Sequence, residues 1–144
     1  MAETQNFENH ARLVPAYHIL AFAIFAINFF WCVYQLIHAP SAQTAISLLL
    51  AIAFVVLFFY ARLFALAVQD RVIRVEMRLR MLQILPADLR PRIGEFSVGQ
   101  LVALRFASDQ ELPALALKVL DEKMEDRKAI KKLVKDWQPD FLRA

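Results

Sequence analysis

A chain of 144 residues with 59% hydrophobic content has room for two membrane-spanning helices and one small soluble unit, but not for two large domains. The formal net charge is +3, and the C-terminal lysines alternate with Asp and Glu, which excludes the one-sided basic patch of a nucleic-acid-binding protein. A single cysteine, Cys32, excludes an intrachain disulfide framework and a cysteine-based metal cluster.

The charge-free stretch from Leu13 to Ala61 contains no Lys, Arg, Asp or Glu. It is too long for one helix across a bilayer, where roughly 20 residues suffice. A turn-like segment at His38 to Gln43 divides it. We therefore expect a polar lead over 1–13, followed by a transmembrane hairpin over 14–67, with spans at about 14–37 and 42–67.

The basic residues next to the second span predict the topology. All but one of the 17 basic residues follow Ala61, whereas the turn carries no charge. The positive-inside rule then places both termini in the cytoplasm and the turn outside. The same arginines are candidate contacts to anionic lipid, or partners in i,i+4 ion pairs such as Asp70–Arg74 and Glu76–Arg80.

The second helix is expected to continue beyond the membrane over 68–85, because no Pro or Gly occurs before Pro86. Apolar residues in this segment are spaced 4, 3, 4, 3, which is a heptad pattern. We call them the seam: Val68, Val72, Val75, Leu79 and Leu82. The seam can pack on the chain's own C-terminal helices or pair with a second copy, and the short pattern favours the first.

A small cytoplasmic helical cap is predicted over 86–144. A single turn or two is expected from Asp88 to Ile93. Ser97 with Gln100 forms a capping-box pattern for a helix through Phe106. The later boundaries are Ser108 or Asp109 as the cap of a helix ending near Glu122, and Asp126 as the start of a last helix through Trp137. The predicted fold class is therefore an all-α membrane protein.

Few residues suggest chemistry. The histidines His10, His18 and His38 are too scattered to share a metal, and Cys32 has no catalytic partner near it. Asn28 lies near the middle of the first span, where a polar side chain favours a hydrogen bond to Thr44, to Ser47 or to another subunit. Phosphate-loop, dinucleotide and nucleophile-elbow motifs are absent, so we expect no cofactor, no metal and no enzymatic activity.

Three parts of the sequence are similar to an uncharacterised bacterial family of small two-span membrane proteins. They are the segment from Val68 to Arg80, the Arg92-Ile-Gly-Glu95 motif, and the segment from Gln100 to Pro113. The lead from Gln5 to His10 and the end from Trp137 to Asp140 resemble the same family. The resemblance implies a protein of a bacterial inner membrane and brings no activity, cofactor or catalytic residue.

The sequence thus predicts a non-enzymatic membrane protein that acts as an assembly, scaffold or accessory subunit, with membrane lipid and either self-association or a larger membrane complex as partners. The alternatives are a homo-oligomeric channel of the mechanosensitive type and, more remotely, a lipid-modifying enzyme that uses Asp70 or His10. Candidate contact residues for lipid or assembly share a polar character and lie at or after the second span: Arg62, Gln69, Asp70, Arg71, Arg74, Arg78, Arg80 and Arg105.

Overall fold

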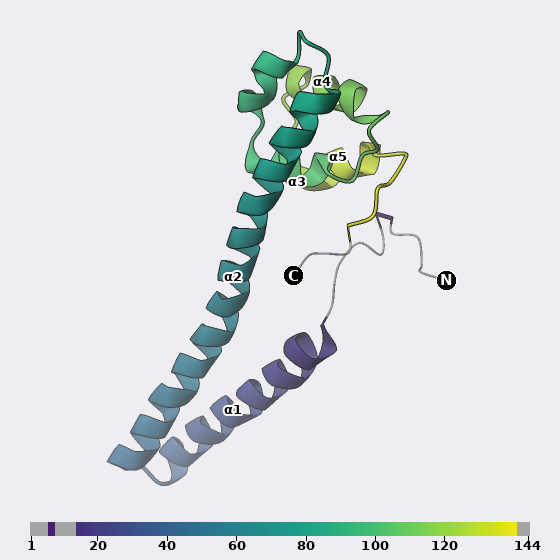
Figure 1. The fold of residues 1–144 in the computed structure, drawn as a ribbon. Helices are drawn as coiled ribbons and strands as arrows, with labels where there is room; N and C mark the ends of the chain where they lie inside the picture. The colour runs from purple at the N-terminus through teal and green to yellow at the C-terminus, as the bar shows by residue number, and fades with distance from the viewer. Residues whose placement is uncertain (1–5, 8–13, 141–144) are drawn as a thin grey trace. The chain divides into compact units, whose positions relative to one another are not determined.

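The chain is all-helical in the part that the structure describes. The structure is a computed structural model, and it describes residues 6–7 and 14–140. The elements in chain order are η1 (Ala16–Ala21), α1 (Phe22–His38), α2 (Ala42–Ile84), η2 (Arg90–Glu95), α3 (Val98–Leu104), α4 (Leu112–Asp121) and α5 (Arg127–Leu133) (Figure 1). Residues 14–140 form no strand, and one isolated β-bridge joins Ala107 to Trp137. The predicted all-α class is confirmed.

The described residues fall into two compact units. One comprises residues 14–66, and the other comprises residues 6–7 and 67–140. The division falls inside α2, which contains neither Pro nor Gly and continues unbroken to Ile84, as the sequence predicted.

In the first unit, η1 and α1 run antiparallel to the apolar part of α2. The Phe25 and Phe54 rings stack with centroids 5.8 Å apart, and the Tyr17 and Phe58 rings stack at 4.4 Å. The Tyr17 hydroxyl also donates a hydrogen bond to the Phe58 carbonyl. η1 is π-helical and continues directly into α1. Two helical stretches, η1–α1 (Ala16–His38) and α2, are long and apolar enough to cross a membrane, judged by length and composition.

A short connection links these two helices. The Ser41 backbone N–H donates to the Thr44 hydroxyl at 2.9 Å, and the Thr44 N–H donates to the Ser41 hydroxyl at 3.1 Å. This reciprocal pair satisfies backbone donors at the start of α2 in the manner of a capping box. The apolar residues that flank it, such as Ile37 and Ile46, are mostly exposed.

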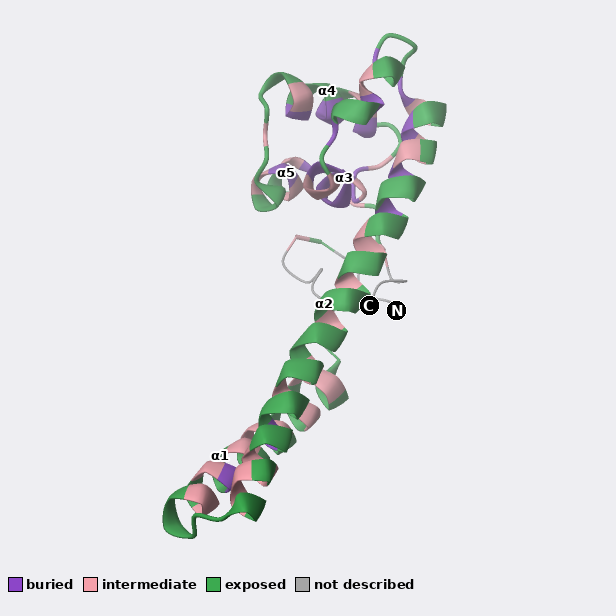
Figure 2. Ribbon diagram, turned by 90° about the vertical axis from the view of Figure 1, so that its left-hand side faces the viewer, coloured by how far each residue is buried: buried purple, intermediate pink, exposed green. Residues whose placement is uncertain are grey.

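The hydrophobic core of the second unit lies between the end of α2 and helices α3, α4 and α5 (Figure 2). We call Ile73, Met77, Met81 and Leu85 the inner ridge, because they recur every four residues and are at most 5% exposed. Such i±4 rows are the ridges that helices of globular proteins use for packing. The inner ridge contributes to one core with α3 residues such as Leu101 and Leu104, and with Phe106, Val119 and Ile130.

The seam does not take part in this core. Its five side chains are between 49% and 62% exposed. The favoured expectation, that the seam packs on the chain's own C-terminal helices, is therefore wrong. Those helices pack on the inner ridge instead. The expectation failed because the end of α2 is apolar on two faces, and the heptad pattern describes only the exposed one.

The local boundaries after Pro86 are partly as predicted. Ser97 and Gln100 form the capping box: Ser97 Oγ accepts from the Gln100 N–H at 3.2 Å, and Gln100 Oε1 accepts from the Ser97 N–H at 2.7 Å. α3 ends at Leu104 rather than Phe106. The turn or two expected over Asp88 to Ile93 is present as a 3₁₀-helix over Arg90–Glu95, which begins and ends two residues later.

The last two helices also differ from expectation. α4 begins at Leu112 after Glu111, whereas Ser108 accepts a hydrogen bond from the Glu111 N–H one turn earlier and does not cap the helix. Asp126 caps α5 as predicted, but α5 ends at Leu133 rather than Trp137. Beyond it the chain is extended, and the Trp137 ring packs 4.7 Å from that of Phe106.

Candidate functional site

Arg80 binds several groups from the segment between α3 and α4. Its Nε and Nη2 donate to Asp109 Oδ1 at 2.8 and 2.6 Å. Nη2 also donates to the Ala107 carbonyl at 2.7 Å, and Nη1 donates to the Arg105 carbonyl at 3.2 Å. A guanidinium with this many partners positions α2 against the C-terminal helices.

A groove of about 520 Å³ lies beside Arg80. It is lined by Ile73, Glu76, Met77, Arg80, Arg105, Gln138, Pro139 and Asp140. The Arg105 side chain is 8% exposed, forms an ion pair with Asp140 at 3.0 Å, and places its guanidinium 4.4 Å from the centre of the Phe106 ring. The ion pair holds the extended C-terminal segment against α3.

Asp70 pairs with α5 rather than with its own helix. Its carboxylate lies 3.7 Å from Arg127 Nη2. The i,i+4 ion pairs Asp70–Arg74 and Glu76–Arg80 are not formed, since Asp70 turns to Arg127 and Arg80 turns to Asp109. These tertiary partners lie far along the chain, so no local spacing could identify them.

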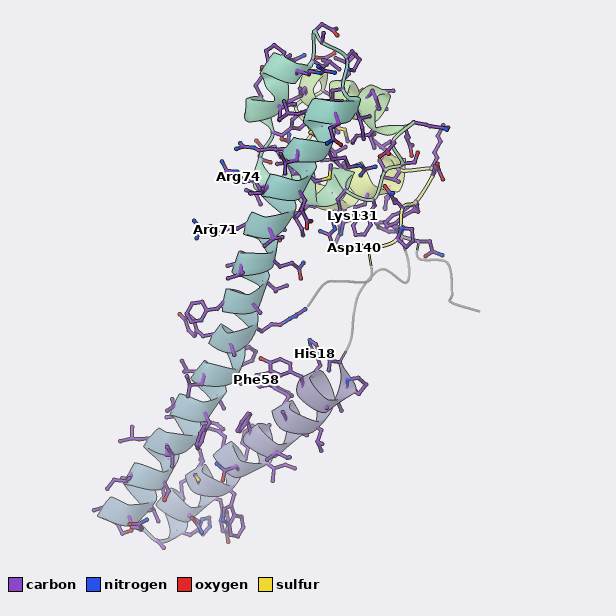
Figure 3. All side chains as sticks on the ribbon, viewed as in Figure 1. His18, Phe58, Arg71, Arg74, Lys131 and Asp140 are labelled. Carbon is purple, nitrogen blue, oxygen red and sulfur yellow. The ribbon has the colours of Figure 1, made fainter. Side chains whose placement is uncertain are left out.

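The remaining candidate arginines divide by exposure. Arg71 and Arg74 are exposed and project from α2 away from Lys131 and Asp140 (Figure 3). Arg62, Gln69 and Arg78 are half-buried. Arg71 and Arg74 are therefore the outward-facing basic residues, whereas Arg80 and Arg105 bind the chain itself.

Asn28 is exposed on α1. It makes no hydrogen bond to Thr44 or Ser47 in the described chain, because those hydroxyls bond locally to the Ala39 and Gln43 carbonyls. The expected contact within the chain is wrong for a geometric reason. The antiparallel register that pairs Phe25 with Phe54 places Asn28 well away from Thr44 and Ser47 along α2.

The histidines show no shared site. His18 and His38 each contact a backbone carbonyl four residues earlier, at 3.1 and 2.9 Å, and His10 lies outside the described residues. Among residues 6–7 and 14–140, no group of three His, Cys, Asp or Glu side chains could hold a metal ion. Cys32 is buried in the first unit with a free thiol.

An electrostatic cluster joins η2 to α4. Arg92 Nη1 donates to Asp121 Oδ1 at 3.2 Å, and Nε lies 3.3 Å from Glu95 Oε2. The hydrogen bond to Asp121, supported by Glu95, raises the pKa of the Arg92 guanidinium above its ordinary value. Arg92 therefore stays charged throughout the physiological range, and this contact is structural.

These features define an all-helical protein with two helices of membrane-spanning length and a packed C-terminal unit. The whole chain, residues 1–144, matches the family described as Family of unknown function (DUF6526), and it belongs to that family. No curated protein and no solved structure matches the chain.

Proposed function

We propose that the chain is a non-enzymatic integral protein of a bacterial inner membrane that acts as an assembly, scaffold or accessory subunit. In this proposal η1–α1 and the apolar part of α2 form a transmembrane hairpin, both termini are cytoplasmic, and the C-terminal unit is a cytoplasmic cap. The length and apolar surface of both helices support the membrane assignment. The concentration of basic residues after Ala61 supports the orientation.

The exposure of Asn28 is the observation that carries the assembly role. Asn28 is central in the first candidate span, which covers Ala16–His38, and it is exposed. A polar side chain at bilayer depth is unfavourable unless another group bonds to it. A helix from another subunit is the simplest source of that group, because the Thr44 and Ser47 hydroxyls already donate to nearby backbone carbonyls.

The test is the composition of the native particle. The full chain is extracted from its native membrane into nanodiscs, and the mass and components of the particle are measured. We expect more than one protein chain per particle, either further copies or another membrane protein. A particle with one copy and no other protein would overturn the assembly role.

Topology is tested separately with single cysteines in a Cys32→Ala background. Ser41→Cys lies in the turn, and Glu95→Cys lies in the C-terminal unit, and both residues are exposed. A membrane-impermeant maleimide added to spheroplasts should label Ser41→Cys before lysis and Glu95→Cys only after lysis. The reverse order would overturn the proposed orientation.

The second candidate is a homo-oligomeric channel. The same observation favours it, because an exposed amide on a spanning helix can line a pore when several copies assemble. Patch recordings from reconstituted liposomes under membrane tension test this role. We expect the Asn28→Leu variant to alter any conductance, and silence of the wild-type protein at every tension would eliminate the channel.

A further inference from the structure

The seam is an exposed apolar strip on the outer face of α2. At about 100° per residue, its centre lies about 180° around the helix from the inner ridge. Val68 and Leu79, for example, are 62% and 57% exposed, whereas Met77 and Met81 are 3% and 0% exposed. The C-terminal helices therefore leave the entire seam uncovered.

Different polar residues flank the seam on its two sides. Val72 and Leu79 take heptad positions a, and Val75 and Leu82 take positions d. In that register the g positions are Arg71 and Arg78, and the e positions are Gln69, Glu76 and Gln83. One flank is thus basic, and the other is acidic or neutral.

Two charged residues that flank the seam on opposite sides, Arg71 and Glu76, have no ion-pair partner among the described residues. Arg71 and Glu76 are both exposed. They are five residues apart on one helix, so they lie on opposite sides of the seam. Each is therefore placed to pair with an opposite charge on a helix that packs against the seam.

We propose that the seam binds a second copy of this chain, and that α2 residues 68–82 of the two copies form a parallel two-stranded coiled coil. In a parallel coil, a g residue faces the e residue five positions later in the other helix. Arg71 then faces the partner's Glu76, and Arg78 faces the partner's Gln83. An antiparallel pair would set the two arginine flanks against each other, which is unfavourable.

Insertion in a membrane would allow so short a coiled coil to form. Two heptads are less than the three or four that identify a coiled coil on their own. Two copies inserted in one bilayer with one orientation, however, are already parallel and at high effective concentration. The inference rests on the proposed function in this respect, since the membrane supplies both conditions.

The charge pattern favours a second copy over a lipid surface. An anionic headgroup layer attracts basic residues, but it repels Glu76 on the e flank. The two flanks of one chain are instead complementary to the two flanks of an identical chain related by a twofold axis.

The first test is disulfide cross-linking of the full chain in its native membrane, in the Cys32→Ala background. Val75→Cys places a thiol at a central d position, and Arg74→Cys is the matched exposed control one residue away. Facing d positions in a parallel coil approach closely enough for a disulfide. Mild oxidation should convert Val75→Cys to a covalent dimer and leave Arg74→Cys monomeric. Equal cross-linking of both variants, or of neither, would overturn the seam as the interface.

The second test exchanges the two charges. Arg71→Glu and Glu76→Arg should each reduce dimer formation in nanodiscs, because each places like charges opposite one another. The double variant Arg71→Glu/Glu76→Arg has the wild-type net charge and should restore the dimer. If the two residues contacted lipid independently, the double variant would not restore the dimer. Dimer formation reduced by the sum of the two single effects would therefore contradict the coil.

The two proposals fail in different ways. A native particle with another membrane protein but one copy of this chain would retain the assembly role and overturn the coil. A particle of several copies in which Val75→Cys does not cross-link would likewise retain the assembly role and overturn the coil. A single chain alone in the particle would overturn both.

Discussion

Arg80 of α2 places two guanidinium nitrogens on one oxygen of Asp109, with Nε and Nη2 at 2.8 and 2.6 Å from Oδ1. The residues are 29 positions apart, and the same guanidinium also binds the Arg105 and Ala107 carbonyls. A planar fork with several donors can satisfy these acceptors together, which the single ammonium of a lysine cannot do.

The variant Arg80→Lys should therefore destabilise the C-terminal unit by about 2 kcal/mol, since hydrogen bonds to charged groups contribute about 1.5–3 kcal/mol. Unfolding by denaturant in detergent, followed through Trp137 fluorescence in a Trp31→Phe background, measures this loss. Arg74→Lys is the matched control, because Arg74 is exposed on the same helix and should leave the transition unchanged. An equal loss in both variants would contradict the role of the Asp109 contact.

The two apolar faces of α2 should respond differently to truncation. Met81 is fully buried and Leu79 is 57% exposed. Met81→Ala should cost about 2–5 kcal/mol of unfolding free energy through the cavity that it leaves. Leu79→Ala should change the same quantity by less than about 0.5 kcal/mol. If the seam forms the proposed coil, Leu79→Ala should also weaken dimer formation in nanodiscs, although the C-terminal unit stays folded.

The capping box at the start of α3 should contribute measurably to stability. Ser97→Ala removes the hydroxyl that accepts from the Gln100 N–H, and such losses cost about 1 kcal/mol. Ser97→Thr keeps the hydroxyl and serves as the control. The midpoint of the Trp137 fluorescence transition compares the two, and a shift of equal size for both would indicate that packing, not capping, explains the loss.

In the first unit, the Tyr17 hydroxyl and ring can be separated experimentally. Tyr17→Phe removes the hydrogen bond to the Phe58 carbonyl and keeps the ring stack at 4.4 Å. We expect a loss of about 0.6 kcal/mol, the average for hydrogen bonds between helices in a bilayer. Thermal unfolding in nanodiscs measures it, with Tyr60→Phe as an exposed control. A larger loss for Tyr60→Phe would show that the hydrogen bond is not what stabilises the helix pair.

The sequence was most informative where one local signal decided the outcome. The absence of Pro and Gly between Ala42 and Leu85 predicted a single long helix, and that helix is present. The Ser97 and Gln100 pair predicted its capping box, because both partners lie within one turn. Asp126 predicted the start of α5 for the same reason.

Sequence reasoning failed where two signals competed or the partner was distant. The end of α2 carries both a heptad seam and an i±4 ridge, and only the structure shows that Ile73 and Met77 are the buried set. The tertiary ion pairs of Asp70 and Arg80 displaced the local i,i+4 pairs. Trp137 leaves the helical pattern because its ring packs on Phe106.

The continuity of α2 has a practical consequence for cleavage. The division between the two units lies within α2, and the inner ridge that one unit needs for its core is part of the same helix. A protease can cut α2 only after local unwinding of its backbone hydrogen bonds, and a cut after Leu85 would sever the inner ridge from the C-terminal helices that share its core.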